Sequence, residues 1–198
     1  TDSDRALLLD FQATLETKPE KAIKLEKDAL AQIETITADN ARLVSNLHAN
    51  LGGLYRMNGH PDLAREHMEK SISLLDQFNL LHINDSIPQI ANYAMFLTEQ
   101  QEPERGISEL QKLSGIIKEY HSDDCLDYAK VQETLGTIYL MTANLPQAKT
   151  HFKRAFKIYE KIWADEPEMI EAKYQEIQEL YPQIGFCIGK NLSGLLTK

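Results

Sequence analysis

Histidine and cysteine are the first residues of this chain to consider for catalysis or metal binding. Six histidines and two cysteines occur among the 198 residues, and none shows a ligand spacing such as His-Glu-x-x-His or Cys-x-x-Cys. His67 and His151 occupy the same place in a repeat described below, which indicates a shared structural position. Cys125 and Cys187 stand alone, and such thiols are most often buried and inert. We expect no metal and no cofactor.

Phosphate and acyl-transfer chemistry also lack their motifs. Residues 185–191 (Gly-Phe-Cys-Ile-Gly-Lys-Asn) look superficially like a phosphate-binding loop. They have one residue too few between the glycines, and asparagine stands where Ser or Thr must hold magnesium. No Gly-x-Ser-x-Gly elbow is present. Acidic pairs such as Asp123-Asp124 fall where helices should begin, and carboxylates are favourable there. We therefore expect that the protein is not an enzyme.

The charge balance and the apolar content exclude further classes. Lys and Arg number 21 against 30 Asp and Glu, for a formal net charge of −9, whereas nucleic-acid binding relies on clustered Lys and Arg. No apolar run approaches the roughly 20 residues of a membrane span, and two cysteines favour a reducing compartment. We expect a cytoplasmic protein with no nucleic-acid and no membrane partner. Because the chain begins at Thr1, we also expect a fragment or a processed product.

A 42-residue repeat organises the chain. Pro19, Pro61 and Pro103 recur at this interval, and Pro146 follows one residue late. Other repeating positions hold either small or large side chains. The small ones are Ala22, Ala64, Gly106 and Ala148, and Gly52, Ala94 and Gly136; the large ones are Leu9, Leu51, Tyr93 and Leu135, and Tyr55, Leu97 and Tyr139. In the first unit Asp10 and Ala13 occupy two of these columns, as in an atypical terminal repeat.

Each unit predicts two antiparallel helices. Apolar residues at three- and four-residue spacing form one helical stripe before each proline and another after it. One pair cannot bury its stripes alone, so the pairs must stack. The predicted fold is an all-α, right-handed superhelical solenoid of antiparallel helix pairs, and residues 1–198 form a single domain. Its units cover about residues 1–38, 39–80, 81–122 and 123–164, and a terminal helical piece follows at 165–198.

Two motifs resemble the tetratricopeptide repeat. Leu51-Gly52-x-x-Tyr55 precedes Ala64-x-x-x-Met68-x-x-Ser71, and Leu135-Gly136-x-x-Tyr139 precedes Ala148-x-x-x-Phe152-x-x-Ala155. His48 and Gln132 stand where the family often has tryptophan, and the period exceeds the usual ~34 residues by about two helical turns. This longer unit is similar to the repeats of kinesin light chains. The resemblance implies a concave surface, lined by the first helix of each pair, that binds extended peptides or partner helices.

The residues that would line this groove lie on the first helix of units two to four and point away from the buried stripe. The candidates are Asn46, Asn50, Arg56, Met57, Asn92, Met95, Lys130, Thr134, Thr137 and Met141. Asn50 and Asn92 could each hold a peptide backbone, because an amide donates and accepts at once, or each could satisfy a neighbouring helix. The three methionines could adapt to a ligand or belong to the core.

The predicted function is non-catalytic: a scaffold or adaptor that binds a peptide or helical segment of another protein. Two alternatives stay open, a peptide-sensing domain of a larger signalling or transcription-regulating protein and a structural subunit that forms homo-oligomers through its solenoid ends. The family's chaperone-tail clamp is a poor match, because only Asn92 and Lys130 fit, and Ala49, Gly53 and Thr134 fill the other positions. The nearly neutral groove does not suit the tryptophan-acidic peptides that kinesin light chains bind.

Overall fold

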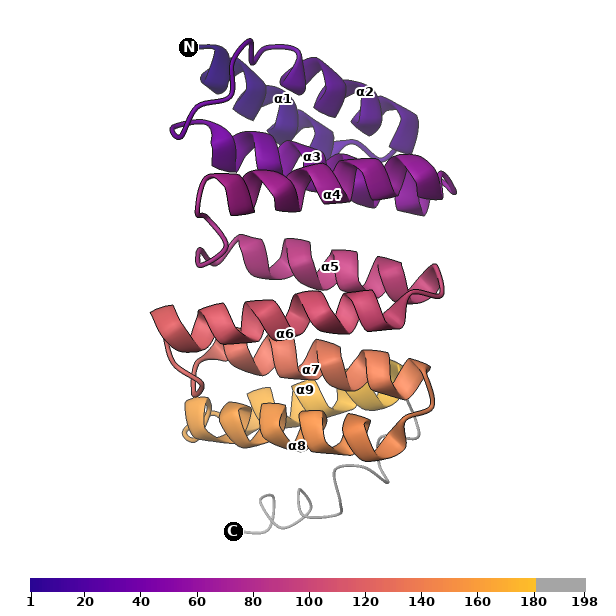
Figure 1. The fold of residues 1–198 in the computed structure, drawn as a ribbon, viewed down its shortest axis with the longest axis vertical. Coiled ribbons are helices and arrows are strands. Elements are labelled where there is room, and N and C mark those ends of the chain that lie inside the picture. Colours follow the sequence, from indigo (N-terminus) through magenta and orange to yellow (C-terminus); the bar gives the residue numbers. More distant parts are fainter. Residues whose placement is uncertain (181–198) are drawn as a thin grey trace. The chain divides into compact units, whose positions relative to one another are not determined.

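The computed structural model describes residues 1–180, which contain nine α-helices and no strand (Figure 1). Four helix pairs and a ninth helix follow the repeat, so the all-α fold of paired helices is confirmed. The helices are α1 (Asp2–Leu15), α2 (Pro19–Leu30), α3 (Ala41–Met57), α4 (Pro61–Gln77), α5 (Ser86–Glu99), α6 (Pro103–Tyr120), α7 (Leu126–Met141), α8 (Leu145–Ile162) and α9 (Pro167–Leu180). The chain divides within α5 into two compact units, Thr1–Phe96 and Leu97–Lys198. A single domain over residues 1–198 stays a prediction.

The turn that joins the helices of a pair repeats with the sequence. Gly59, Gln101 and Ala143 stand 42 residues apart and have left-handed backbones, with φ of 74°, 65° and 58°. The N–H of the next residue then bonds back to the helix, as in His60 N to the Tyr55 carbonyl at 2.9 Å. Glycine adopts a left-handed backbone freely, whereas other residues carry strain there. Gln101 and Ala143 therefore hold a strained turn that Gly59 makes without strain.

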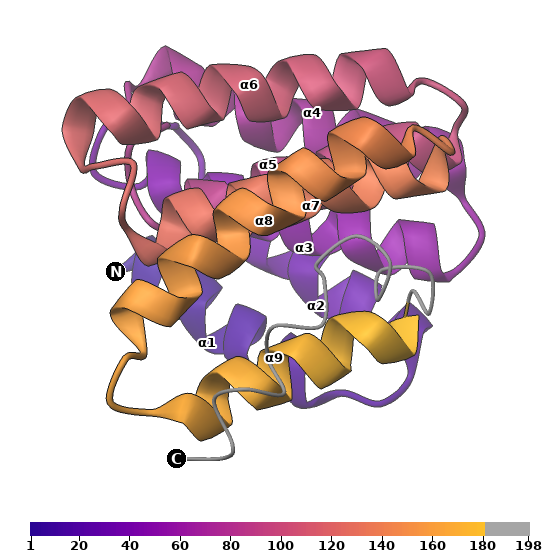
Figure 2. The same ribbon diagram turned by 90° about the horizontal axis from the view of Figure 1, so that it is seen from below.

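Small residues let the two helices of a pair approach closely. In the first unit α3 meets α4 at Gly52, where an added Cβ atom would lie 2.6 Å from Met68 Cγ. In the second unit α7 and α8 run side by side (Figures 1 and 2) and meet at Gly136, where a Cβ atom would lie 2.9 Å from the Phe152 ring. Both distances are too short for an ordinary contact, so the predicted close packing at this column is confirmed.

The repeated histidines occupy a structural position, as predicted. The rings of His67 and His151 stack on the repeat tyrosine of their own pair, with centroids 5.4 and 5.3 Å apart. His67 Nδ1 lies 2.9 Å from His48 Nδ1, and His151 Nδ1 lies 2.9 Å from Gln132 Oε1. His48 and Gln132 thus make the same contact in the place where the family often has tryptophan. Burial lowers the pKa of His48 to about 4, and it also lowers the pKa of His67 and of His151.

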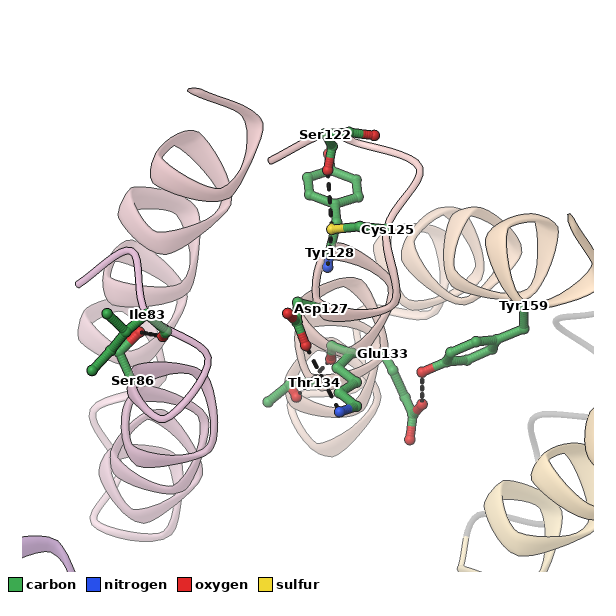
Figure 3. Close-up of polar contacts among 10 residues, drawn as sticks. Ile83, Ser86, Ser122, Cys125, Asp127, Tyr128, Glu133, Thr134 and Tyr159 are labelled. Atoms are coloured by element: carbon green, nitrogen blue, oxygen red, sulfur yellow. Dashed lines mark hydrogen bonds and ion pairs between the residues drawn. The ribbon is translucent and has the colours of Figure 1, made fainter. Parts of the chain in front are cut away.

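Within the second unit, helix α9 contacts α7 and α8 through polar and aromatic side chains. Tyr159 Oη donates to Glu133 Oε2 at 2.5 Å (Figure 3), and Lys173 Nζ of α9 lies 3.2 Å from Glu133 Oε1. The Phe156 and Tyr174 rings meet edge to face at 6.0 Å. Helix α9 is thus the described part of the predicted terminal helical piece. Residues 181–198, which include Cys187 and the loop-like segment 185–191, lie outside the described residues.

Cys125 caps the N-terminus of α7. Its Sγ accepts the Tyr128 backbone N–H at 3.4 Å, and the thiol donates to the Ser122 carbonyl at 3.1 Å (Figure 3).

Within residues 1–180, no group of three or more His, Cys, Asp or Glu side chains is placed to hold a metal ion. In the same range no helix is both long enough and apolar enough to cross a membrane.

Candidate functional site

An open pocket of about 490 Å³ lies in the first unit, between residues of α1, α3, α4 and α5. Half of the predicted groove residues line it. They are Asn46, Asn50, Arg56, Met57 and Asn92. The remaining lining residues are Asp10, Ala49, Gly53, Met68, Ser71, Asp85, Pro88 and Gln89. Amides, carboxylates and small side chains thus dominate a surface that can hydrogen-bond to a ligand.

The other predicted groove residues do not line this pocket. They are Met95 on α5 and, in the second unit, Lys130, Thr134, Thr137 and Met141 on α7. Lys130 Nζ lies 3.8 Å from Asp127 Oδ1, and Thr134 Oγ1 donates to the Lys130 carbonyl at 3.0 Å (Figure 3). Both polar groups are therefore engaged within their own helix. A ligand role for these five residues stays a prediction.

The two asparagines of the repeat column have different surroundings. Asn50 Nδ2 donates to Asp10 Oδ1 at 2.8 Å and to Glu26 Oε1 at 3.1 Å, so this side chain satisfies groups of α1 and α2. Asn92 is exposed, and its side chain has no hydrogen-bond partner within the described part of the chain. Asn50 thus contacts carboxyl groups of neighbouring helices, whereas Asn92 makes no such contact among the described residues, and a ligand role for either asparagine stays a prediction.

Gln89 joins three helices of the first unit in a network that the sequence analysis missed. Its Oε1 lies 2.9 Å from Ser45 Oγ on α3 and accepts from Ser71 Oγ on α4 at 2.5 Å. Its Nε2 donates to Asn46 Oδ1 at 2.6 Å. Ser45 and Ser71 are 0% and 1% exposed, so the network forms a fixed polar side of the pocket. Ser71 was visible in the repeat, but no sequence signal paired it with Gln89.

Two carboxyl groups replace a packing contact in the first helix pair. Asp10 stands at the repeat position of Gly52, and Glu26 stands at that of Met68. Glu26 is 1% exposed, and its Oε2 accepts no hydrogen bond from the described residues. Burial, aided by the charge of Asp10, raises the pKa of Glu26 to about 8, while the hydrogen bond from Asn50 opposes this rise. Glu26 is therefore mostly protonated at pH 7.

A second feature missed from the sequence is an apolar face on α1. Four of its large side chains are exposed to more than half of their area: Leu7 (51%), Leu8 (58%), Phe11 (59%) and Leu15 (68%). One repeat further on, the same positions hold Ala49, Asn50, Gly53 and Met57, which all line the pocket. Extending the predicted groove column back by 42 residues would have found this face, but the groove prediction began at the second unit.

The family model described as "Tetratricopeptide repeat" matches residues 86–161, which run from the start of α5 into α8. Residues 86–161 thus match the tetratricopeptide repeat family. The motif positions at Leu135, Gly136 and Tyr139, which carried the resemblance in the sequence, fall within the matched residues.

Solved structures share the fold of this chain. The crystal structure of BtubC (BKLC) from P. vanneervenii has a TM-score of 0.72 and 19% identity, over 91% of this chain and 72% of that one. A crystal structure of the Podosopora anserina putative kinesin light chain nearly identical TPR-like repeats has a TM-score of 0.64 and 14% identity, over 74% and 69%. The predicted all-α helical repeat solenoid is confirmed. No curated protein matches this chain in sequence.

Proposed function

We propose that this protein is a non-catalytic adaptor that binds a peptide or helical segment of a partner protein in the pocket of its first unit. A tetratricopeptide repeat fold is in general a scaffold for protein–protein interaction. The observation that carries the finer proposal is the pocket itself, in which five predicted groove residues converge. A cytoplasmic location belongs to the same proposal, on the strength of the cysteine content.

The chemistry of the pocket supports a peptide as ligand. The Gln89 network holds Asn46 in place, since the Asn46 carbonyl oxygen already accepts from Gln89 Nε2. Asn92 adds an exposed amide without a partner among the described residues. An amide can accept from a peptide N–H and donate to a peptide carbonyl, and a side chain that is already fixed loses little entropy on binding. The pocket is therefore suited to a peptide backbone.

A random peptide library displayed on phage would test this function directly. The full 198-residue chain is immobilised, enriched peptides are synthesised, and their affinity is measured by fluorescence anisotropy for the parent and for Asn92→Ala. We expect Asn92→Ala to weaken binding about fivefold, because one hydrogen bond is worth about 1 kcal/mol. Asn84→Ala is the matched control, since Asn84 is an exposed asparagine of the first unit that does not line the pocket. Equal affinity for both variants, or no enriched peptide, would contradict the proposal.

A further inference from the structure

Helix α1 exposes a face of large apolar side chains, whereas the other exposed residues of this helix are polar. Leu7, Leu8, Phe11 and Leu15 follow one another at intervals of one, three and four residues and form a single stripe. Each is more than half exposed, although side chains of this size normally contribute to a core. A contiguous exposed patch of this kind is typical of an interaction surface.

The stripe differs from the face by which a helix of this repeat packs on the preceding pair. In α3 that face contains Leu47, which is fully buried against Ala6 and Ala29 of the first pair. Its counterpart in α1 is Arg5, which is exposed. The apolar residues of α1 instead match the pocket-lining positions of α3. The four stripe residues do not line the pocket themselves, but by repeat position they correspond to residues that do, and Asp10 of the same helix lines it.

Asp10 places one negative charge between the stripe and the pocket. It lies one helical turn from Leu7 and next to Phe11 in the sequence, and it lines the pocket. Its Oδ1 accepts from Asn50 Nδ2 at 2.8 Å, which fixes the carboxylate. Glu26 behind it is 1% exposed and does not line the pocket, so the carboxyl group that a ligand can reach at this position is that of Asp10. A basic side chain is the complementary group, and the whole chain, at −9, attracts cations as well.

We propose that the α1 face binds a partner segment that carries large apolar side chains and one lysine or arginine, with the apolar side chains on Leu8, Phe11 and Leu15 and the cation on Asp10. This inference rests on the proposed function, because it names the chemistry of the segment that enters the same pocket. The polar backbone of the segment would continue toward Asn46 and Asn92.

The same phage selection tests this inference through the composition of the enriched peptides. We expect them to be enriched in Leu, Ile, Phe or Met together with Lys or Arg, relative to the unselected library. Enrichment of acidic peptides, or of peptides without large apolar residues, would overturn the inference. If such acidic or non-apolar peptides bound Asn92→Ala more weakly than the parent, the proposed function would be supported although this inference had failed. If no peptide were enriched, both would fall.

Variants of the stripe provide the second arm. The double variant Leu8→Ser/Phe11→Ser should weaken binding of an enriched peptide at least tenfold, and Leu15→Ser alone about threefold. Leu63→Ser is the matched control, because Leu63 is an exposed leucine of α4 (39%) that does not line the pocket, and it should leave affinity within twofold of the parent. Circular dichroism and the thermal midpoint check that each variant is folded. If the double variant is unfolded, Leu15→Ser decides, and unchanged affinity with that variant overturns the inference.

The charge and the identity of the occupant are tested separately. Asp10→Asn should weaken a lysine-containing peptide about fivefold and leave its norleucine analogue unaffected. Equal losses for both peptides would overturn the role of the cation. Sedimentation velocity of the chain alone, at two concentrations, tests a second copy as the occupant. If the chain self-associates and Phe11→Ser abolishes this, the α1 face binds a second copy of the chain instead of a partner segment, and the inference is overturned.

Discussion

Replacing Glu26 with glutamine should make the stability of the protein less sensitive to alkaline pH. Burial and the adjacent Asp10 raise the pKa of Glu26 to about 8 in the folded chain, from an ordinary value of 4.5. A carboxyl group whose pKa rises on folding holds its proton more tightly in the folded than in the unfolded state. The stability that this proton contributes is therefore fully present below pH 4.5 and is lost as the pH rises toward 8.

The expected magnitude follows from the two pKa values. Each tenfold change in proton affinity corresponds to about 1.4 kcal/mol. Between pH 5 and pH 8 the unfolded carboxyl group is mostly deprotonated while the folded one keeps much of its proton, so each rise in pH favours the unfolded state further. The parent should thus lose about 3 kcal/mol of unfolding free energy through Glu26 over this range. Glutamine has no proton to lose there, and its amide can donate to Asp10.

Urea denaturation followed by circular dichroism at pH 5, 6, 7 and 8 measures this effect. The histidines are the same in both proteins, so the difference between E26Q and the parent isolates Glu26. E20Q is the matched control, because Glu20 is an exposed glutamate of the same helix. A difference between E26Q and the parent that stays constant from pH 5 to pH 8 would refute the reasoning, and so would an equal pH effect in E20Q.

Three further predictions concern the stability of the helix pairs. Ala143→Gly should raise the unfolding free energy by about 1 kcal/mol, because glycine relieves the strain of a φ of 58°; urea denaturation that shows no gain would contradict this. Gly136→Ala should lower it by about 1–3 kcal/mol, since the new methyl group would meet the Phe152 ring at 2.9 Å. A Cβ atom added at Gly53 would meet no atom within 4 Å, so Gly53→Ala should instead raise the unfolding free energy by about 0.5–1 kcal/mol. Equal denaturation curves for Gly136→Ala and Gly53→Ala would count against the packing argument. His48→Gln should stabilise the protein by about 1–2 kcal/mol at pH 5 but not at pH 8. The folded ring has a pKa of about 4 and resists protonation at pH 5, whereas the unfolded ring accepts a proton below its ordinary pKa of 6.5. Urea denaturation at both pH values tests this, and a gain of equal size at both would exclude this cause.

The sequence predicted the helix pairs because their signals are local. Prolines at a constant interval mark where each second helix begins, and apolar spacing marks the buried face. The close approach at Gly52 and Gly136 was also predictable, since small residues recur on both helices of a pair, Ala64 facing Gly52 and Ala148 facing Gly136. These features depend only on position within the repeat, and the repeat supplies that position.

The pocket was only partly predictable, because its polar contacts join different repeats. Gln89 contacts Ser45 and Asn46, which lie 44 and 43 residues earlier, and the period alone does not pair them. Asn50 looked equivalent to Asn92, yet only Asn50 meets carboxyl groups of the first pair, because Asp10 and Glu26 replace the usual glycine and apolar residue there. Residues at the same repeat position can therefore have different contacts, because the residues of the adjacent repeat differ.

The carboxyl pair of the first repeat also determines where the folded chain should open first. Helices α3 and α4 meet through Gly52 and Met68, whereas α1 and α2 present Asp10 and Glu26 at the same positions. Segments with weaker packing open locally and exchange their amide hydrogens sooner. We expect the amides of α1 and α2 to exchange faster than those of α3 and α4, after correction for intrinsic rates, and the gap to widen toward pH 8. A protein bound to α1 would then slow this exchange, so the first helix pair would become more ordered in the complex than it is alone.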